Sequence, residues 1–196
     1  MVKAIVFDMN GVFVEAPEKS VLERIRSLKG TGKWIALSNY YLNIWEFERG
    51  FLAPFEFWKK VFVSLTEQEF HGLVEGAYSE QFQRNEDLYS LAQQLSAGYD
   101  LYCLSNSNFL QGKEYRRQKL YAPFKRLFLS HETHEIKPFP MAFEHFLKET
   151  GLKARDCVFV EDWTVNVLAS AALGFRGVVF HDAGDLKEKL AKLGVL

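Results

Sequence analysis

The chain has 196 residues, of which 48% are hydrophobic and 25% are charged, and its formal net charge is −1. This composition is ordinary for a globular protein with one sizeable core and room for a small second lobe. The sequence contains no long basic block and no run near the ~20 apolar residues that a membrane-spanning helix needs. We therefore expect no nucleic-acid partner, no membrane partner and a cytoplasmic location.

The first predicted element is a buried strand over Ala4–Phe7. Its residues are all apolar, which is typical of a strand covered on both faces. The strand ends at Asp8, and Asn10 and Gly11 follow closely. A carboxylate therefore stands directly after the first strand, at the start of a loop that contains glycine.

The stretch Val14–Asn85 breaks the strand pattern. Strand signals are few, apolar residues recur at helical spacing, and Thr66 with Glu69 has the pattern of a capping box. We interpret its dense aromatic residues mostly as the core of this stretch, with some lining a substrate pocket or a dimer contact. They are Tyr40, Tyr41, Trp45, Phe47, Phe51, Phe55, Phe57 and Trp58. The pattern predicts a helical insertion over residues 14–85.

Helical patterns and apolar runs alternate in the rest of the chain. The helical patterns cover Glu86–Leu95, Met141–Leu147, Thr164–Leu173 and Asp185–Leu193. The apolar runs predict strands at Leu101–Leu104, Val158–Val160 and Gly177–Phe180, with a weaker candidate at Leu127–Ser130. This alternation predicts an α/β fold with a doubly wound parallel sheet, in which residues 1–13 and 86–196 form the core domain.

Polar side chains follow several of these strands. They are Asp8, Ser105, Asn106, Lys137 and the pair Glu161 and Asp162. Ligands of a doubly wound sheet bind beyond the carboxyl ends of its strands. We therefore expect these side chains to meet at one edge of the sheet.

The set suits phosphoryl transfer. A carboxylate such as Asp8 can attack phosphorus and form an acyl phosphate. A divalent ion held by Asp8 and the acidic pair would relieve the repulsion between nucleophile and phosphate, and oxygen ligands suit Mg²⁺. Ser105 and Lys137 would bind the phosphate oxygens that are not transferred.

Four segments, in this order, resemble the motifs of the haloacid dehalogenase superfamily. They are VFDMNGV, LYCLSNS, EIKPFPMAFEHFLKETGL and CVFVEDWTVNVLASAALGFRGVVF. The resemblance covers nearly the whole chain outside the insertion. It implies a Rossmann-like core, with the insertion as a helical cap between the first and second motifs.

The resemblance also implies a Mg²⁺-dependent phosphatase that acts on a small phosphorylated metabolite through an aspartyl phosphate on Asp8. The implied catalytic residues are Asp8, Asn10, Ser105 and Lys137. The implied substrate-binding residues are Ser105, Asn106 and Lys137, and the implied Mg²⁺ ligands are Asp8, Asn10, Glu161 and Asp162. The acidic pair counts against a metal-free dehalogenase.

The sequence departs from the family's pattern at Asn10, where an Asp usually acts as general acid and base. The backbone carbonyl of Asn10 can still bind Mg²⁺, but its amide cannot shuttle a proton. General acid–base catalysis contributes roughly 10²–10⁴-fold, so we expect slow turnover. Four explanations stay open: a natural weak phosphatase of esters with good leaving groups, a phosphate-ligand binding protein, an Asp-to-Asn change in an active phosphatase, and partial deamidation at Asn10.

Other residues carry simpler interpretations. Cys103 and Cys157 lie inside apolar runs, which indicates buried thiols without a metal. His131 and His134 flank the loop of Lys137 and are interpreted as exposed loop histidines. Asn166 follows the acidic pair and is either structural or part of the site.

Overall fold

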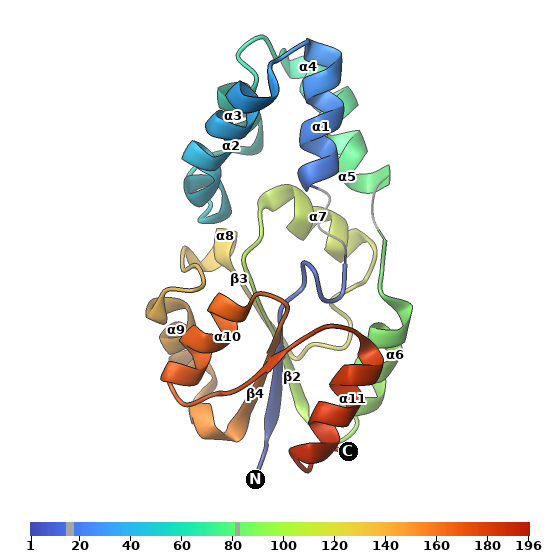
Figure 1. Ribbon diagram of the computed structural model, residues 1–196, viewed down its shortest axis with the longest axis vertical. Helices are drawn as coiled ribbons and strands as arrows, with labels where there is room; N and C mark the ends of the chain where they lie inside the picture. Colours follow the sequence, from blue (N-terminus) through green and yellow to red (C-terminus); the bar gives the residue numbers. More distant parts are fainter. Residues whose placement is uncertain (15–17, 81–82) are drawn as a thin grey trace.

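The computed structural model describes residues 1–14, 18–80 and 83–196. Its core is a five-stranded sheet in the order β3-β2-β1-β4-β5, in which all neighbouring strands are parallel (Figure 1). The strands are β1 (Ala4–Phe7), β2 (Asp100–Ser105), β3 (Arg126–Leu129), β4 (Cys157–Glu161) and β5 (Arg176–Val179). The predicted strands and the α/β fold class are confirmed.

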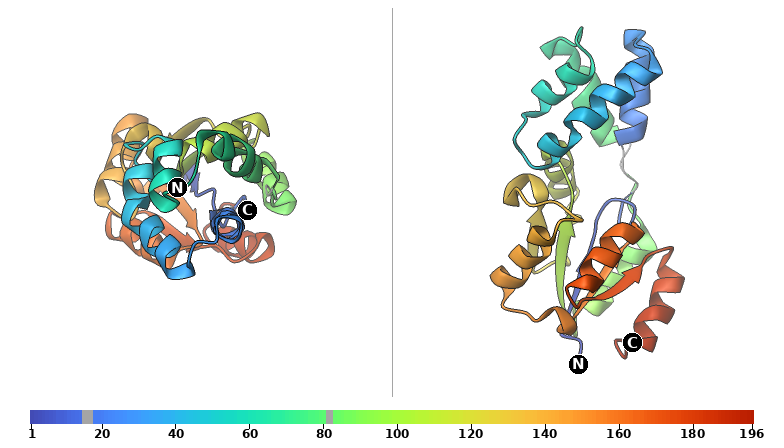
Figure 2. Two further views of the ribbon diagram at one scale, coloured as in Figure 1. Left: turned by 90° about the horizontal axis from the view of Figure 1, so that it is seen from above. Right: turned by 60° about the vertical axis from the view of Figure 1, so that its left-hand side comes forward.

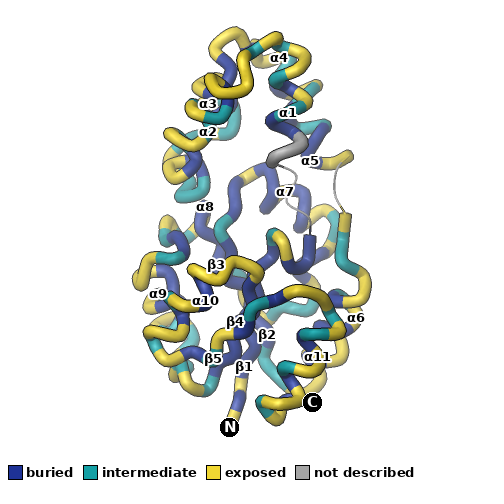
Figure 3. Tube along the Cα trace, in the orientation of Figure 1, coloured by how far each residue is buried: buried dark blue, intermediate teal, exposed yellow. Residues whose placement is uncertain are grey.

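Each face of the sheet has its own hydrophobic cluster, because successive residues of a strand point to opposite faces. In β1, Ile5 and Phe7 join one cluster, whereas Ala4 and Val6 join the other. The covering helices are α6 (Glu86–Leu95) and α11 (Ala183–Lys192) on the first face and α9 (Pro140–Thr150) and α10 (Thr164–Ala172) on the second (Figure 2). The three central strands, β1, β2 and β4, are almost entirely buried between these helices, whereas the edge strands β3 and β5 are partly exposed (Figure 3).

Local capping explains where two of the helices begin. Helix α11 begins at Ala183, before the predicted start, because the Asp182 side chain accepts a hydrogen bond from the Asp185 N–H at 2.8 Å. Helix α7 (Phe109–Arg117) is not predicted by the apolar pattern. It begins after Asn108, whose side chain accepts from the N–H of Gln111 while the Gln111 side chain accepts from the N–H of Asn108. Such reciprocal bonds satisfy the free N–H groups at a helix start.

Six helical elements lie beyond the carboxyl ends of the strands, and we refer to them together as the cap (Figures 1 and 2). They are α1 (Glu18–Lys29), α2 (Lys33–Glu48), α3 (Pro54–Val61), α4 (Glu67–Glu69), the π-helix η1 (Phe70–Glu75) and α5 (Gly76–Glu80). The predicted capping box of Thr66 and Glu69 is present at the start of α4. Two further short elements belong to the core: α8 (Ser130–Thr133) and the 3₁₀-helix η2 (Ala154–Asp156).

The cap packs around a hydrophobic cluster that is distinct from the two clusters of the sheet. Phe47, Phe57 and Trp58 are buried in it, and the rings of Phe47 and Phe57 stack at 4.1 Å. Among the aromatic residues expected to lie mostly in the core of this region, three are exposed: Tyr41, Trp45 and Phe51. We propose that the cap is the separate helical domain expected over residues 14–85, whose positions 15–17 and 81–82 lie outside the described residues.

Within the described residues, every helix is too short or too polar to cross a lipid bilayer.

Candidate active site

The strand order places the end of β1 between the ends of β2 and β4. The register pairs Phe7 with Cys103 on one side and with Val160 on the other. The chain first adds strands on one side of β1 and then, from β4, on the opposite side. This is the switch point at which ligands of doubly wound sheets bind. Asp8, Ser105 and Glu161 therefore emerge at the same edge, as predicted.

Lys137 links two of these carboxylates. Its buried Nζ lies 2.9 Å from Asp8 Oδ1 and 2.6 Å from Glu161 Oε2. Burial alone would lower the pKa of Lys137, but the charges of Asp8 and Glu161 outweigh it and raise the pKa well above its ordinary value. The ammonium group is therefore a permanent positive charge beside Asp8.

The backbone of Lys137 is fixed by Asn106. The Asn106 Nδ2 donates to the Lys137 carbonyl, and the Lys137 N–H donates to Asn106 Oδ1, both at 2.8 Å. These two bonds engage both ends of the amide. Ser105, at the end of β2, is buried, and its hydroxyl donates to the Asn106 carbonyl at 3.4 Å.

Three carboxylates gather at this edge of the sheet. Asp8, Glu161 and Asp162 each offer an oxygen, and these oxygens lie within 4.8 Å of one another. Burial and the charge of Glu161 raise the pKa of Asp8 to about 7, against the lowering effect of Lys137. Burial and Glu161 also raise the pKa of Asp162 to about 6. When all three ionise, Lys137 balances only one of the three negative charges.

This cluster fits Mg²⁺. Its ligand atoms are all oxygens, which Mg²⁺ prefers, and a dication would balance the excess negative charge. Gly11 adopts φ +78°, and a Cβ at this position would overlap Asp162 Oδ2. The loop after β1 therefore approaches Asp162 as closely as it does only because residue 11 is glycine.

Glu161 is held by three N–H groups. Its Oε2 accepts from Lys137 and from Asn166 Nδ2 at 2.9 Å, and its Oε1 accepts from the Trp163 N–H at 3.2 Å. Asn166 is buried, and within the described part of the chain its Oδ1 has no hydrogen-bond partner. Asn166 thus contacts Glu161 of the acidic pair directly and helps to hold that carboxylate in place.

The Asn10 side chain makes three hydrogen bonds. Its Nδ2 donates to the Asn106 carbonyl at 3.0 Å, and its Oδ1 accepts from Gln111 Nε2 at 3.2 Å and from the Tyr115 hydroxyl at 2.7 Å. Gln111 and Tyr115 belong to α7 and are buried. Sequence reasoning missed both residues, and the spacing of Asn108 and Gln111 was the one available sign of a helix here.

Of the two histidines that we expected to be exposed, only one is. His134 is exposed, as expected, but His131 is 3% exposed, with its Nδ1 3.0 Å from the Ser107 hydroxyl. The two cysteines are free and buried, as predicted, and burial raises the pKa of both thiols.

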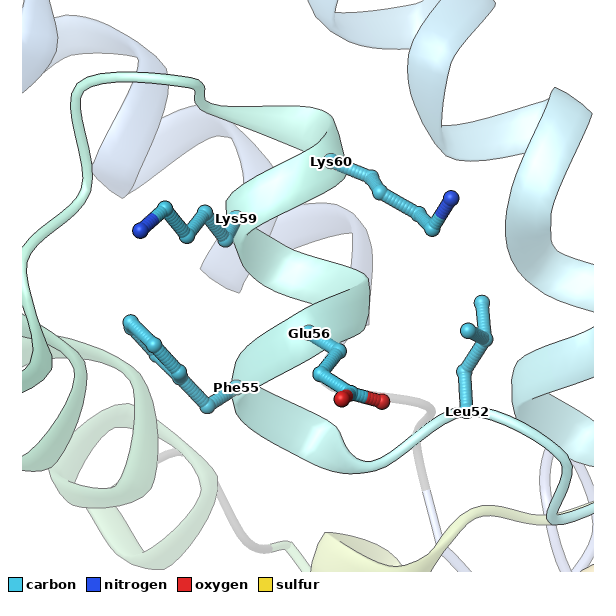
Figure 4. A pocket seen from close by; sticks show the side chains of 5 residues that line it. All are labelled: Leu52, Phe55, Glu56, Lys59 and Lys60. Carbon is cyan, nitrogen blue, oxygen red and sulfur yellow. The ribbon is translucent and has the colours of Figure 1, made fainter.

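A pocket of about 390 Å³ lies in the cap, away from these residues (Figure 4). Four of its five lining side chains project from α3, and the fifth is Leu52. None of the residues at the strand ends lines this pocket. We therefore place the candidate active site at the strand ends and not in this pocket.

The parallel sheet and the carboxylates at its edge define a Rossmann-like α/β protein whose candidate site lies beyond the ends of its strands. The family model for haloacid dehalogenase-like hydrolase matches residues 2–174. The chain belongs to this family and is an enzyme of the hydrolase class.

Two characterised relatives are similar in sequence. The D-ribitol-5-phosphate phosphatase of Bacteroides thetaiotaomicron is 27% identical over an alignment of 203 positions that covers 97% of each chain. The chloroplast flavin mononucleotide hydrolase 1 of Arabidopsis thaliana is 25% identical over 154 residues, which cover 78% of this chain and 62% of that protein.

Two solved structures share the fold. A haloacid dehalogenase family enzyme from Bacteroides thetaiotaomicron, in complex with magnesium and inorganic phosphate, superposes with a TM-score of 0.79 at 19% identity. The match covers 93% of this chain and 96% of that one. A haloacid dehalogenase phosphatase from Thermococcus onnurineus gives a TM-score of 0.71 at 19% identity, covering 96% and 98% of the two chains.

Proposed function

We propose that this enzyme is a Mg²⁺-dependent phosphatase of a small phosphorylated metabolite that works through an aspartyl phosphate on Asp8. The observation that carries the proposal is the contact of Lys137 with Asp8 inside a cluster of three carboxylates. A nucleophile, a fixed positive charge and a set of oxygen ligands therefore share one edge of the sheet. The names of the two relatives, a sugar-alcohol phosphate phosphatase and a flavin mononucleotide hydrolase, support a small phosphorylated substrate.

In this proposal the Asp8 carboxylate attacks phosphorus, and water then hydrolyses the resulting aspartyl phosphate. Lys137 orients Asp8 through the 2.9 Å contact and offsets the negative charge of the phosphoryl group. Ser105 donates a hydrogen bond to a phosphoryl oxygen. Asn106 acts through Lys137, because both ends of its amide hold the Lys137 backbone.

The oxygens of Asp8 and Asp162 and the backbone carbonyl of Asn10 would hold Mg²⁺. The ion would supply positive charge against the phosphate and its developing charge. Glu161, also expected as a ligand, already accepts three N–H bonds. We propose that it acts mainly by fixing Lys137 and by adding negative charge to the ion site.

One observation favours a second function. Asn10 cannot act as a general acid, so the site is suited to binding a phosphorylated ligand with little or no turnover. The two functions share the fold, the Mg²⁺ site and the phosphate contacts. They differ in whether Asp8 reacts.

The test is hydrolysis of para-nitrophenyl phosphate by the wild-type chain and by Asp8→Asn, with Mg²⁺ and with a chelator. We expect slow Mg²⁺-dependent hydrolysis that falls by roughly 10³-fold or more in Asp8→Asn, as when a nucleophile is removed from other hydrolases. Asp87→Asn, which changes an exposed carboxylate in α6, is the control and should retain the wild-type rate.

Calorimetry distinguishes the two functions. If wild-type protein binds Mg²⁺ and inorganic phosphate but its residual hydrolysis is unaffected by Asp8→Asn, the binding function replaces the phosphatase proposal.

A further inference from the structure

We infer that this site, if it is the phosphatase proposed above, acts on phosphates whose leaving group departs as an anion without being protonated. Such substrates are acyl phosphates and the phosphate esters of acidic hydroxyls, such as enol and aryl phosphates. Alkyl phosphates, the class to which D-ribitol 5-phosphate belongs, would be poor substrates. The inference rests on how the Asn10 side chain is held.

The surroundings of Asn10 are complementary to an amide. The Asn106 carbonyl accepts from the Asn10 Nδ2 at 3.0 Å and, more weakly, from the Ser105 hydroxyl at 3.4 Å. Gln111 Nε2 and the Tyr115 hydroxyl require an acceptor, and the Asn10 Oδ1 supplies it. An ionised carboxylate in the same place would set one oxygen against the Asn106 carbonyl oxygen. The contacts therefore suit the residue that the sequence contains.

No proton can pass through this arrangement to a leaving group. The Tyr115 hydroxyl directs its proton at Asn10 Oδ1 over 2.7 Å, and an amide does not accept a proton and release another near neutral pH. The other partners of the Asn10 side chain are an amide and a backbone carbonyl. None of these three groups is a carboxylic acid or an imidazole, which are the usual proton donors near pH 7.

The same bonds fix Asn10 in place. Asn106, which accepts from Asn10, is itself joined to Lys137 by two bonds of 2.8 Å. A continuous set of hydrogen bonds thus runs from Gln111 and Tyr115 on α7, through Asn10 and Asn106, to Lys137 beside the nucleophile. Asn10 is a positioning residue in this set, because turning its side chain toward a substrate would break three bonds.

Leaving groups differ greatly in how much they need a proton. Alkyl alcohols have a pKa of about 16, close to that of water. A phenol such as that of tyrosine has a pKa of about 10, and a carboxylic acid has a pKa of about 4. A site in which residue 10 supplies no proton therefore favours the last two classes, since their anions are stable in water.

The chemical steps balance without a proton from position 10. An Asp8 oxygen forms a bond to phosphorus, and the bond from phosphorus to the leaving oxygen breaks with its electron pair on that oxygen. The leaving group departs as its anion. Water then attacks the phosphorus of the aspartyl phosphate, both of its hydrogens leave with dihydrogen phosphate, and the Asp8 carboxylate is regenerated.

The experiment measures kcat/KM for acetyl phosphate, for aryl phosphates of graded leaving-group pKa and for an alkyl phosphate such as glycerol phosphate. For the wild-type chain we expect kcat/KM to fall steeply as the leaving-group pKa rises. Asn10→Asp should raise kcat/KM for the alkyl phosphate by about 10²–10⁴-fold, and for acetyl phosphate by much less. In the Asn10→Asp variant, kcat/KM should therefore depend less steeply on the pKa of the leaving group.

Asn10→Ala is the second variant. It removes the positioning bonds without adding an acid, so we expect lower kcat/KM for every substrate and an unchanged dependence on the leaving group. Thermal unfolding checks that each variant is folded, and the wild-type series decides the inference even if a variant is not.

If the kcat/KM of the wild-type chain did not change with the pKa of the leaving group, the inference would be overturned while the phosphatase proposal stayed intact. An equal effect of Asn10→Asp on all substrates would also overturn the inference. Failure of the proposed function looks different, because then no substrate in the series would be hydrolysed in a way that depends on Asp8.

Discussion

His131 is buried at the start of α8, where its Nδ1 lies 3.0 Å from the Ser107 hydroxyl and its ring packs against that of Phe109 in a T-shaped arrangement. Burial lowers the pKa of this imidazole, the charge of Arg116 adds to the effect, and Glu132 and Ser107 oppose it. The folded protein therefore favours the neutral ring more strongly than the unfolded chain does.

This difference predicts a pH-dependent stability. As the pH falls below about 6.5, the ordinary pKa of histidine, the unfolded chain binds a proton that the folded protein resists. The contribution of His131 is fully present above that pH and is lost as the pH falls toward its lowered folded-state pKa. His131→Gln should remove a contribution that increases the unfolding free energy as the pH rises. We therefore expect a less positive slope of unfolding free energy against pH than in the wild type, measured by urea titration between about pH 5 and 7.5.

His181→Gln, which changes an exposed histidine, is the matched control and should keep the wild-type slope. Identical slopes for wild type and His131→Gln would show that His131 does not titrate differently in the two states.

At the level of elements, the loop after β1 depends on Gly11. Its φ of +78° disfavours any residue with a Cβ, and that Cβ would overlap the Asp162 carboxylate. Gly151, at the end of α9, has a similar φ of +68°, but a Cβ there would meet no atom within 4 Å. Comparing alanine substitutions at these two glycines therefore distinguishes the cost of the left-handed backbone from the displacement of the Asp162 side chain.

We expect Gly11→Ala and Gly151→Ala to lower the unfolding free energy by similar amounts, about 1–2 kcal/mol each, because both place alanine in the left-handed region. Only Gly11→Ala should also weaken Mg²⁺ binding, by roughly 10–100-fold, since Asp162 must move away. Isothermal titration calorimetry with Mg²⁺ measures this. Equal Mg²⁺ affinity in the two variants would remove Asp162 from the proposed ligand set.

The strands could be predicted from the sequence because each is a short, wholly apolar run bounded by polar residues. Asp8, Ser105 and Glu161 could be placed at one edge because parallel strands end at the same side of a sheet. Helix α7 could not be predicted in the same way. Its segment FLQGKEYRR contains few apolar residues, and its start is set by side-chain bonds of Asn108 and Gln111.

The parts of the site that sequence reasoning missed depend on contacts between distant segments. Asn10 meets Gln111 and Tyr115, which lie about a hundred residues further along the chain. His131 looks like a loop histidine in the sequence, but a Cβ at Gly112 would overlap its ring, so α7 packs directly onto it. The local sequence contains no pattern that would predict either of these contacts with α7.

At the scale of the whole molecule, the end of α2 is hydrogen-bonded to the start of α8. The Ser130 hydroxyl accepts from the Ser107 N–H at 2.9 Å and lies 2.6 Å from the Glu48 carbonyl. Beside it, Arg49 Nε donates to the His134 carbonyl at 2.9 Å, and the His134 ring lies over Phe51. These contacts join the cap to the loop that leads to Lys137.

Ser130→Ala should therefore destabilise both parts together. It leaves the Ser107 N–H and the Glu48 carbonyl without this partner, and we expect a loss of about 1–3 kcal/mol in the free energy of unfolding. Ser27→Ala removes an exposed hydroxyl that bonds within α1, and should cost no more than about 0.5 kcal/mol. Urea unfolding followed by tryptophan fluorescence compares them. Equal losses would mean that the buried hydroxyl does not join cap and core.

The central position of β1 has a consequence for synthesis on the ribosome. β1 is made first, yet its neighbours β2 and β4 begin only at Asp100 and Cys157. At about 5–20 residues per second, β1 waits roughly 5–20 s for β2 and longer for β4. During that time the helices of the cap emerge and can pack with one another. The strand that leads to Asp8 is thus an unpaired apolar segment, open to chaperones, until β2 and β4 have been translated.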